Sequence, residues 1–189
     1  TITDKDAVAQ DIGDSTTITF SAGTSSVGGS MTVYRAETVE VEVTDSSIDS
    51  TADDAYDLDV TVSPGSASRL EVDGTDASPT AGDSQSLTIT ATDNYGNTAT
   101  TYTGDKSLIF SGPSASPDGN NPTVTNKTPS AIAMGTTTTV TFTAGVNSAG
   151  GTMVLYKAES VSVDVSDGTI NSTGDAAYDF DVVVGQNTA

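Results

Sequence analysis

The sequence predicts an all-β protein in which short strands form two packed sheets with Greek-key connections. Apolar and polar residues alternate in several runs of five to eight residues, and this period of two is typical of antiparallel strands with one buried face. Val and Thr, which favour strands, are frequent in these runs. Turn residues such as Gly, Pro, Asn and Asp separate the runs, and no segment keeps the apolar spacing that a helix requires.

Composition and charge exclude several classes of protein. The 189 residues include 26 acidic and 6 basic side chains, for a formal net charge of -20, and neither Cys nor His occurs. Without them the chain cannot build disulfides, thiolate metal sites, a zinc hydrolase site or Ser-His-Asp catalysis. The negative charge argues against nucleic acid as a partner, and no apolar run reaches the roughly 18 residues of a membrane-spanning helix. We therefore expect a non-enzymatic protein that neither binds nucleic acid nor inserts directly into a membrane.

The chain repeats part of its own sequence. When it is shifted by 122 residues, residues 1–67 align with residues 123–189 without a gap, and about half of the positions are identical. We therefore predict tandem repeats of about 122 residues. Residues 68–189 form one complete repeat, and residues 1–67 are the C-terminal part of another. We also expect the chain to belong to a longer array.

Residues 1–67 contain two runs with clear alternation. Val alternates with Glu in 37–45, and apolar residues alternate with Asp in 55–62. Each run has an apolar face that an opposing sheet must cover. We predict that residues 1–67 cannot close a sandwich alone, and that either strands from a neighbouring chain complete them or preceding strands of a longer array do. The residues that would otherwise face water are Ile18, Phe20, Val39, Val41, Tyr56, Leu58 and Val60.

The complete repeat shows the same alternation between turn signals. Leu87, Ile89 and Ala91 share one face of their run, and Val140, Phe142 and Ala144 share a face of another. We expect strands near 69–73, 85–93, 106–111, 123–127, 138–144, 152–157, 160–166 and 177–184.

The first half of the complete repeat also carries a family pattern. The segment LTITATDNYGNTATTYTGDKSLIFSG (87–112) contains D-x-x-G-N, then Y-x-G, then a strand, at Asp93, Gly96, Asn97, Tyr102, Gly104 and Phe110. It resembles the immunoglobulin-like repeats of large bacterial surface adhesins of the invasin and intimin type, although Thr98 stands where that family often has Pro. The resemblance implies an immunoglobulin-like Greek-key β-sandwich at the extracellular cell surface. Such modules serve as stalks, spacers and binding heads alike.

Acidic clusters are the densest candidate site chemistry. Glu40 and Glu42 lie on the run before the one that carries Asp57 and Asp59, and like charges that face each other destabilise a sheet. Calcium, which takes about six to eight oxygen ligands, would relieve that repulsion. The alternative is a solvated acidic face that serves solubility, because no EF-hand spacing is present. The candidate calcium ligands are Glu40, Glu42, Asp45, Asp49, Asp53, Asp57, Asp59, Asp164, Asp167, Asp175, Asp179 and Asp181.

These observations favour a structural role. We expect an extracellular module of a long bacterial surface protein or surface fibre that acts as a stalk or spacer for adhesion. Its partners are then neighbouring repeats of the same protein, together with strands of another chain where these complete residues 1–67. Two alternatives stay open: a ligand-binding module for carbohydrate or a receptor through the loops 93–105 and 112–122, or a subunit of an S-layer, sheath or phage fibre.

Overall fold

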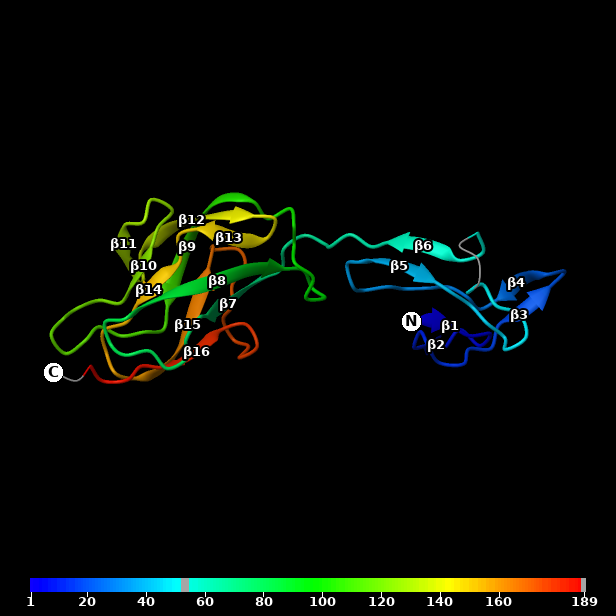
Figure 1. The fold of residues 1–189 in the computed structure, drawn as a ribbon, viewed down its shortest axis with the longest axis horizontal. Coiled ribbons are helices and arrows are strands. Elements are labelled where there is room, and N and C mark those ends of the chain that lie inside the picture. Colours follow the sequence, from blue (N-terminus) through cyan, green and yellow to red (C-terminus); the bar gives the residue numbers. More distant parts are fainter. Residues whose placement is uncertain (52–54, 188–189) are drawn as a thin grey trace. The chain divides into compact units, whose positions relative to one another are not determined.

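The computed structural model describes residues 1–51 and 55–187, and every helix or strand element in them is a β-strand. This confirms the all-β prediction. None of the described residues forms a helix that is long and apolar enough to cross a membrane. The chain divides into a first unit, Thr1–Ser63, and a second unit, Pro64–Ala189, and each is described by itself (Figure 1).

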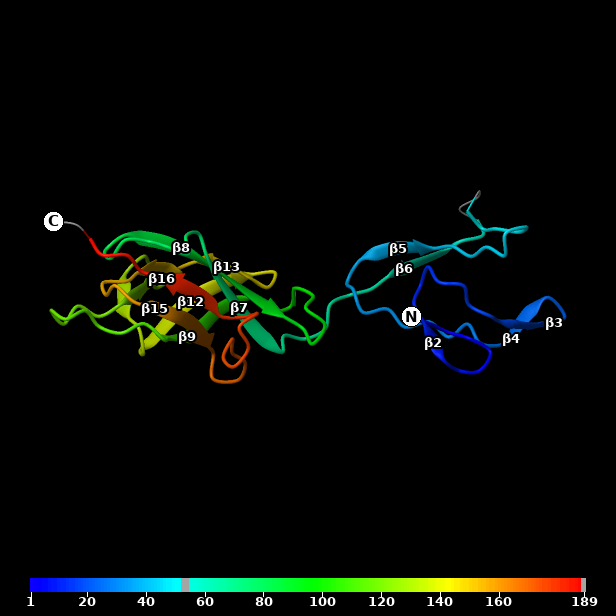
Figure 2. The ribbon, with the colours of Figure 1, turned by 90° about the horizontal axis from the view of Figure 1, so that it is seen from below.

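The described residues of the first unit form three separate two-stranded antiparallel sheets. The pairs are β1 (Ile2–Thr3) with β2 (Ala9–Gln10), β3 (Thr19–Ser21) with β4 (Thr24–Val27), and β5 (Thr38–Val41) with β6 (Leu58–Thr61). Figures 1 and 2 show β5 and β6 side by side in both views. Among the described residues of this unit only Ser50 is buried, so these hairpins enclose no apolar core.

The ten described strands of the second unit form one hydrogen-bonded network that is open at both ends, not a closed barrel. In order, the strands are β11 (Ala131–Ala133), β10 (Thr123–Thr125), β14 (Thr152–Val154), β8 (Ser84–Thr92), β13 (Val146–Ala149), β12 (Thr137–Thr143), β9 (Gly104–Ser111), β15 (Ser160–Ser166) and β16 (Phe180–Val183), with β7 (Arg69–Gly74) also paired to β8. A single residue pair, Val146 with Thr90, joins β13 to β8. The strands on either side of this pair form two groups, which is consistent with a β-sandwich.

One apolar core gathers side chains from both groups of strands. Leu87, Ile89 and Ala91 of β8 lie in it with at most 3% of their surface exposed, as their alternation predicts. Phe110 of β9 and Phe142 of β12 are its largest fully buried side chains. The other buried members are Leu70, Val72, Leu108, Val124, Val140, Met153, Leu155, Val163, Val165, Phe180, Val182 and Val184.

In the second unit, the structure adds two strands to those predicted from the sequence, β11 and β13. β13 follows β12 through the two-residue turn Ala144–Gly145, in which both φ angles are positive, at 47° and 89°. Such turns join the strands of tight hairpins and usually contain Asn or Gly at the first position. The expectation that Ala144 extends the apolar face of β12 was therefore wrong, because the strand ends at Thr143 and Ala144 is exposed.

The hairpins of the first unit share their register with strands of the second. All four residue pairs of β5–β6 recur in β15–β16 at positions 122 residues later. The β3–β4 and β12–β13 ladders each shift register just before a phenylalanine, Phe20 or Phe142. The pairs of β1–β2 likewise recur in β10–β11. Matching local sequence thus accompanies matching local pairing.

Candidate functional site

The predicted calcium ligands on β5 and β6 come together only in part. Glu40 stands directly opposite Asp59 across the ladder, as expected. Glu42 and Asp57 lie one residue beyond these strands, so the expected face of paired carboxylates is reduced to one cross-strand pair. Two carboxylates at such positions repel each other, and solvent or a cation must screen the repulsion.

Two further candidates of the first unit bind groups of their own turns. Asp45 Oδ1 accepts the backbone N–H groups two and three residues later, at 2.8 and 2.7 Å. These bonds, first the one from Ile48, hold the pKa of Asp45 below its ordinary value. Asp49 Oδ1 accepts the hydroxyl of Thr51 at 3.0 Å. Asp53 lies outside the described residues.

In the second unit, the predicted ligands gather around Asp179. Its Oδ1 is buried and has no hydrogen-bond partner among the described residues. Burial raises the pKa of Asp179, and the charges of Asp181, Asp164 and Asp175 raise it further. The structure therefore brings three of the candidate carboxylates close enough to Asp179 to disfavour its charged form.

The neighbours of Asp179 nevertheless turn toward other partners. Asp181 accepts the hydroxyl of Ser162 at 2.5 Å, and Asp164 accepts that of Ser172 at 3.2 Å. No three acidic side chains in the described part of the chain are arranged to hold a metal ion. These donors do not form a ready-made cation site, and calcium binding stays a prediction.

Asp167, another candidate ligand, joins two distant parts of the second unit. Its Oδ2 accepts the hydroxyl of Tyr102 at 2.8 Å, and its Oδ1 accepts the N–H of Ile170 at 2.8 Å. The Tyr102 ring meets Phe142 edge-on, with 4.9 Å between ring centroids. Burial, followed by the bond to Asp167, raises the pKa of Tyr102. Sequence reasoning missed this link because the two residues are 65 positions apart and no local pattern relates them.

The D-x-x-G-N segment at the start of the predicted binding loop is a tightly bonded turn. Asp93 is only 4% exposed, and its carboxylate accepts the N–H groups of Gly65, Tyr95 and Asn97 at 2.8, 2.8 and 3.0 Å. The side-chain amide of Asn97 contributes most, and together these bonds lower the pKa of Asp93 to about 2. The motif therefore holds this turn and the segment at Gly65 in place.

The first unit exposes many large apolar side chains. Phe20 is 65% exposed and Tyr56 is 73% exposed, whereas Phe142, the counterpart of Phe20, is 2% exposed. Exposure is confirmed for three of the predicted residues, Phe20, Tyr56 and Leu58, and the other four are half-buried. Exposed apolar side chains in such number favour an interaction with another polypeptide. The exposed set is Val8, Ile12, Phe20, Val27, Tyr34, Val43, Ile48, Tyr56 and Leu58.

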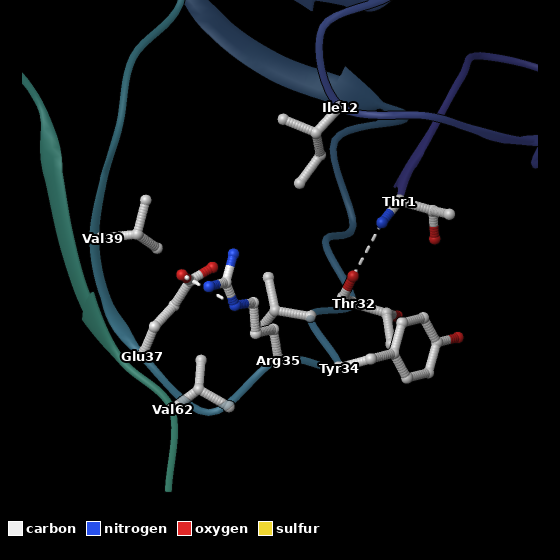
Figure 3. Close-up of a pocket in the computed structure, with 9 residues that line it drawn as sticks. Thr1, Ile12, Thr32, Tyr34, Arg35, Glu37, Val39 and Val62 are labelled. Atoms are coloured by element: carbon white, nitrogen blue, oxygen red, sulfur yellow. Dashed lines mark hydrogen bonds and ion pairs between the residues drawn. The ribbon is translucent and has the colours of Figure 1, made fainter. Parts of the chain in front are cut away.

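A shallow hollow of about 270 Å³ opens on this unit (Figure 3). Apolar side chains line much of it, and the figure shows Ile12, Val39 and Val62 around it. The ion pair between Arg35 and Glu37, at 3.4 Å, lies beside them. The remaining lining residues are Thr1, Thr32, Val33 and Tyr34. Because its walls are mainly carbon, the hollow suits an apolar side chain better than a charged ligand.

A comparison with protein-family models and with curated proteins finds no match. The structure thus offers two candidate sites: the acidic side chains, and the exposed apolar side chains of the first unit with the hollow beside them. The carboxylates mostly bond to nearby hydroxyl and N–H groups. Ile12 and Tyr34, two of the exposed apolar side chains, line the hollow, and this set of side chains is the stronger candidate for an interaction surface.

Proposed function

We propose that this chain is a non-catalytic, extracellular structural module, built from tandem immunoglobulin-like β-sandwich repeats, of a long bacterial surface protein or surface fibre. It acts there as a stalk or spacer for adhesion. The observation that carries this proposal is the recurrence of the first unit's strand pairings 122 residues later, in an all-β unit with one apolar core. A chain that repeats one sandwich lengthens without any need for a catalytic site.

Two features of the second unit support a mechanical role. Its outer strands are held by long ladders, such as the six residue pairs between β7 and β8. Its first segment is held by the bonds from Gly65 and Ser68 to Asp93 and Thr92. Tension along the chain must therefore break several backbone hydrogen bonds before β7 leaves the sheet.

The net charge of -20 supports a role in which the surface of the module is in contact with solvent. A strongly charged surface keeps long arrays soluble and separate. The acidic side chains then serve mainly as a solvated surface, and they remain candidate ligands for calcium.

Single-molecule stretching of the whole chain tests the mechanical role. We expect the second unit to unfold in one resolved force peak, and the first unit to extend without one because its described strands enclose no apolar core. A second unit that extends smoothly at low force contradicts the proposal. A chain in which Phe142 is replaced by Ala serves as the control, and its peak should fall in force.

Assembly through strands is the second candidate function. The exposed apolar residues of the first unit favour it, because a fibre or lattice subunit presents such surfaces to its neighbours.

A further inference from the structure

We propose that the exposed apolar side chains of the first unit, together with the open edges of β3, β4 and β5, form a binding site for a polypeptide segment with the strand pattern of residues 68–122. In the second unit, β8 pairs with β13 and β14, and β9 pairs with β12 and β15. In the first unit, β3, β4 and β5 correspond to β12, β13 and β15. Each of the three has one partner, and no strand among the described residues of that unit takes the place of β8 or β9. A sheet edge of this kind is a template for a further strand.

The same segment supplies the burial that the first unit lacks. Tyr102, which belongs to 68–122, packs edge-on against Phe142, and the counterpart of Phe142 is the exposed Phe20. Gly74 approaches Phe180 so closely that a Cβ there would lie 2.3 Å from the ring. Phe180 is 6% exposed, whereas its counterpart in β6 is 55% exposed. Residues 68–122 thus cover the side chains that are bare in the first unit.

Polar anchors point to the same partner. Five side chains of 123–187 contact residues in 68–122. Lys127 and Thr141 both donate to the carboxylate of Asp105. Glu159 accepts the N–H of Ser114 at 2.7 Å, Asp167 accepts the hydroxyl of Tyr102 at 2.8 Å, and the ring of Tyr178 lies 4.5 Å from the guanidinium of Arg69. The first unit has the same residue type at all five positions, namely Lys5, Thr19, Glu37, Asp45 and Tyr56.

A sixth anchor differs between the two units. Asn147 accepts the N–H of Ile89 at 2.8 Å, and Ser25 stands in its place. Overall, about half of the aligned positions are identical, so five identical anchors out of six exceed the general similarity. If the first unit bound any apolar partner without specificity, it would not need a lysine, a glutamate and an aspartate at these positions.

The hollow of Figure 3 marks one contact that such a segment would make with the first unit. Val33 lines it, and the counterpart Leu155 is 3% exposed in the second unit. There Gly82 donates its N–H to the carbonyl of Leu155 at 2.7 Å, and Ala81 packs against the core. An incoming segment of this pattern therefore has the backbone carbonyl of Val33, the counterpart of Leu155, as a hydrogen-bond acceptor beside the hollow.

The occupant is accordingly the N-terminal part of a repeat of this same type. It brings strands with one apolar face, an acid for Lys5 and a tyrosine hydroxyl for Asp45. This inference goes beyond the proposed function, because it concerns what completes the first unit and not what the array does. Force measurements on the second unit do not bear on it.

The test lengthens the whole chain by a second copy of residues 68–122 joined ahead of Thr1, so that Pro122 precedes Thr1 as it precedes Thr123. Amide hydrogen exchange then reports on β3–β6. We expect these amides to exchange at least about 100-fold more slowly than in the original chain, as in a strand within a core. The second unit should keep its exchange rates, and the extended chain should remain monomeric.

A matched control carries Leu87→Asp and Ile89→Asp in the added copy alone, because both side chains lie in the core at 3% and 0% exposure. We expect the control to exchange like the original chain. Replacing Asp45 by Asn in the extended chain should speed exchange of β5 and β6 by about tenfold through loss of the tyrosine anchor.

Three results would overturn the proposal. The first is unchanged exchange in β3–β6 after the extension. The second is equal protection by the control, since it would show that any added chain suffices. The third is a stable dimer of the original chain with protected β3–β6, which would assign the surface to a second copy.

Discussion

The two units contain the same hairpins in the same register and differ in what covers them. In the second unit, residues 68–122 add β7, β8 and β9, and Phe142 is 2% exposed; in the first unit the corresponding Phe20 is 65% exposed. Turn residues and alternation therefore suffice to set the pairing of a hairpin. Burial of its apolar face depends on strands that are distant in sequence.

Removal of a phenylalanine breaks this comparison most sharply. We expect Phe142→Ala to lower the free energy of unfolding of the second unit by about 3–5 kcal/mol, because it empties a packed core. The matched change Phe20→Ala should lower the free energy of unfolding of the first unit by less than about 1 kcal/mol, because that side chain is already exposed. Urea unfolding followed by amide signals of each unit measures both, and equal losses would contradict the difference in burial.

A single hydroxyl gives a smaller effect of the same kind. Tyr102→Phe removes the bond to Asp167 and should destabilise the second unit by about 1–2 kcal/mol. Tyr56→Phe, at a tyrosine that is 73% exposed, is the control and should change stability by less than about 0.5 kcal/mol. If Tyr102→Phe has no more effect than the control, the hydroxyl contributes nothing to the fold.

Acid should weaken the second unit through Asp93. Its pKa falls from 3.8 to about 2 on folding, so its contribution is complete above pH 3.8 and is lost as the pH drops toward 2. Asp93→Asn should therefore reduce stability at pH 7 and flatten its pH dependence between these values. Thermal unfolding at several pH values measures this, and an unchanged slope would exclude Asp93 as the group responsible. Asp4→Asn in the first unit should leave the melting of the second unit unchanged.

The smallest expected effect comes from Asp179. Its raised pKa means that folding disfavours its charged form, so it destabilises the second unit at pH 7, and this effect disappears on acidification below its ordinary value of 3.8. Asp179→Asn should raise the melting temperature by about 2 °C at pH 7. Asp57→Asn, at the corresponding position of the first unit, should leave the second unit unchanged. A lower melting temperature for Asp179→Asn would contradict the repulsion.

Calcium tests whether the same carboxylates bind a cation. Bound calcium should raise the melting temperature in millimolar calcium relative to EDTA at fixed ionic strength, because it stabilises only the folded state. Asp179→Asn should then remove that rise. Identical melting curves in both buffers would leave a solvated acidic face as the explanation.

The sequence was most informative where structure follows from local pattern. Alternation correctly placed Leu87, Ile89 and Ala91 in the core, because period two and burial on one face are the same property of a strand. It missed β13 because Ala144, with φ at 47°, occupies a turn position that Asn or Gly usually fills. A turn cannot be recognised from local sequence when its residue, here Ala144, adopts a positive φ but does not favour it.

The candidate site was predicted less well. The cluster of acidic residues suggested shared ligands, yet Asp45 and Asp49 bond within their own turns and Asp167 reaches Tyr102. Whether a carboxylate binds a neighbour, a turn or a distant hydroxyl depends on tertiary contacts. The exposed Phe20 was predictable, since the repeat alignment showed which strands its counterpart has and it lacks.

The partners of β8 also determine how the chain folds in time. The N–H of Ile89 bonds to Asn147, 58 residues further along, and such distant pairings slow folding to about milliseconds or seconds. During synthesis, β8 and β9 leave the ribosome before β12 to β15, the later strands that pair with them, and their apolar faces are then bare. During that interval, the first unit of a neighbouring chain presents to β8 and β9 the same strand edges that their own later partners will present. Refolding yield should consequently fall with protein concentration, because capture by another molecule competes with completion of the second unit.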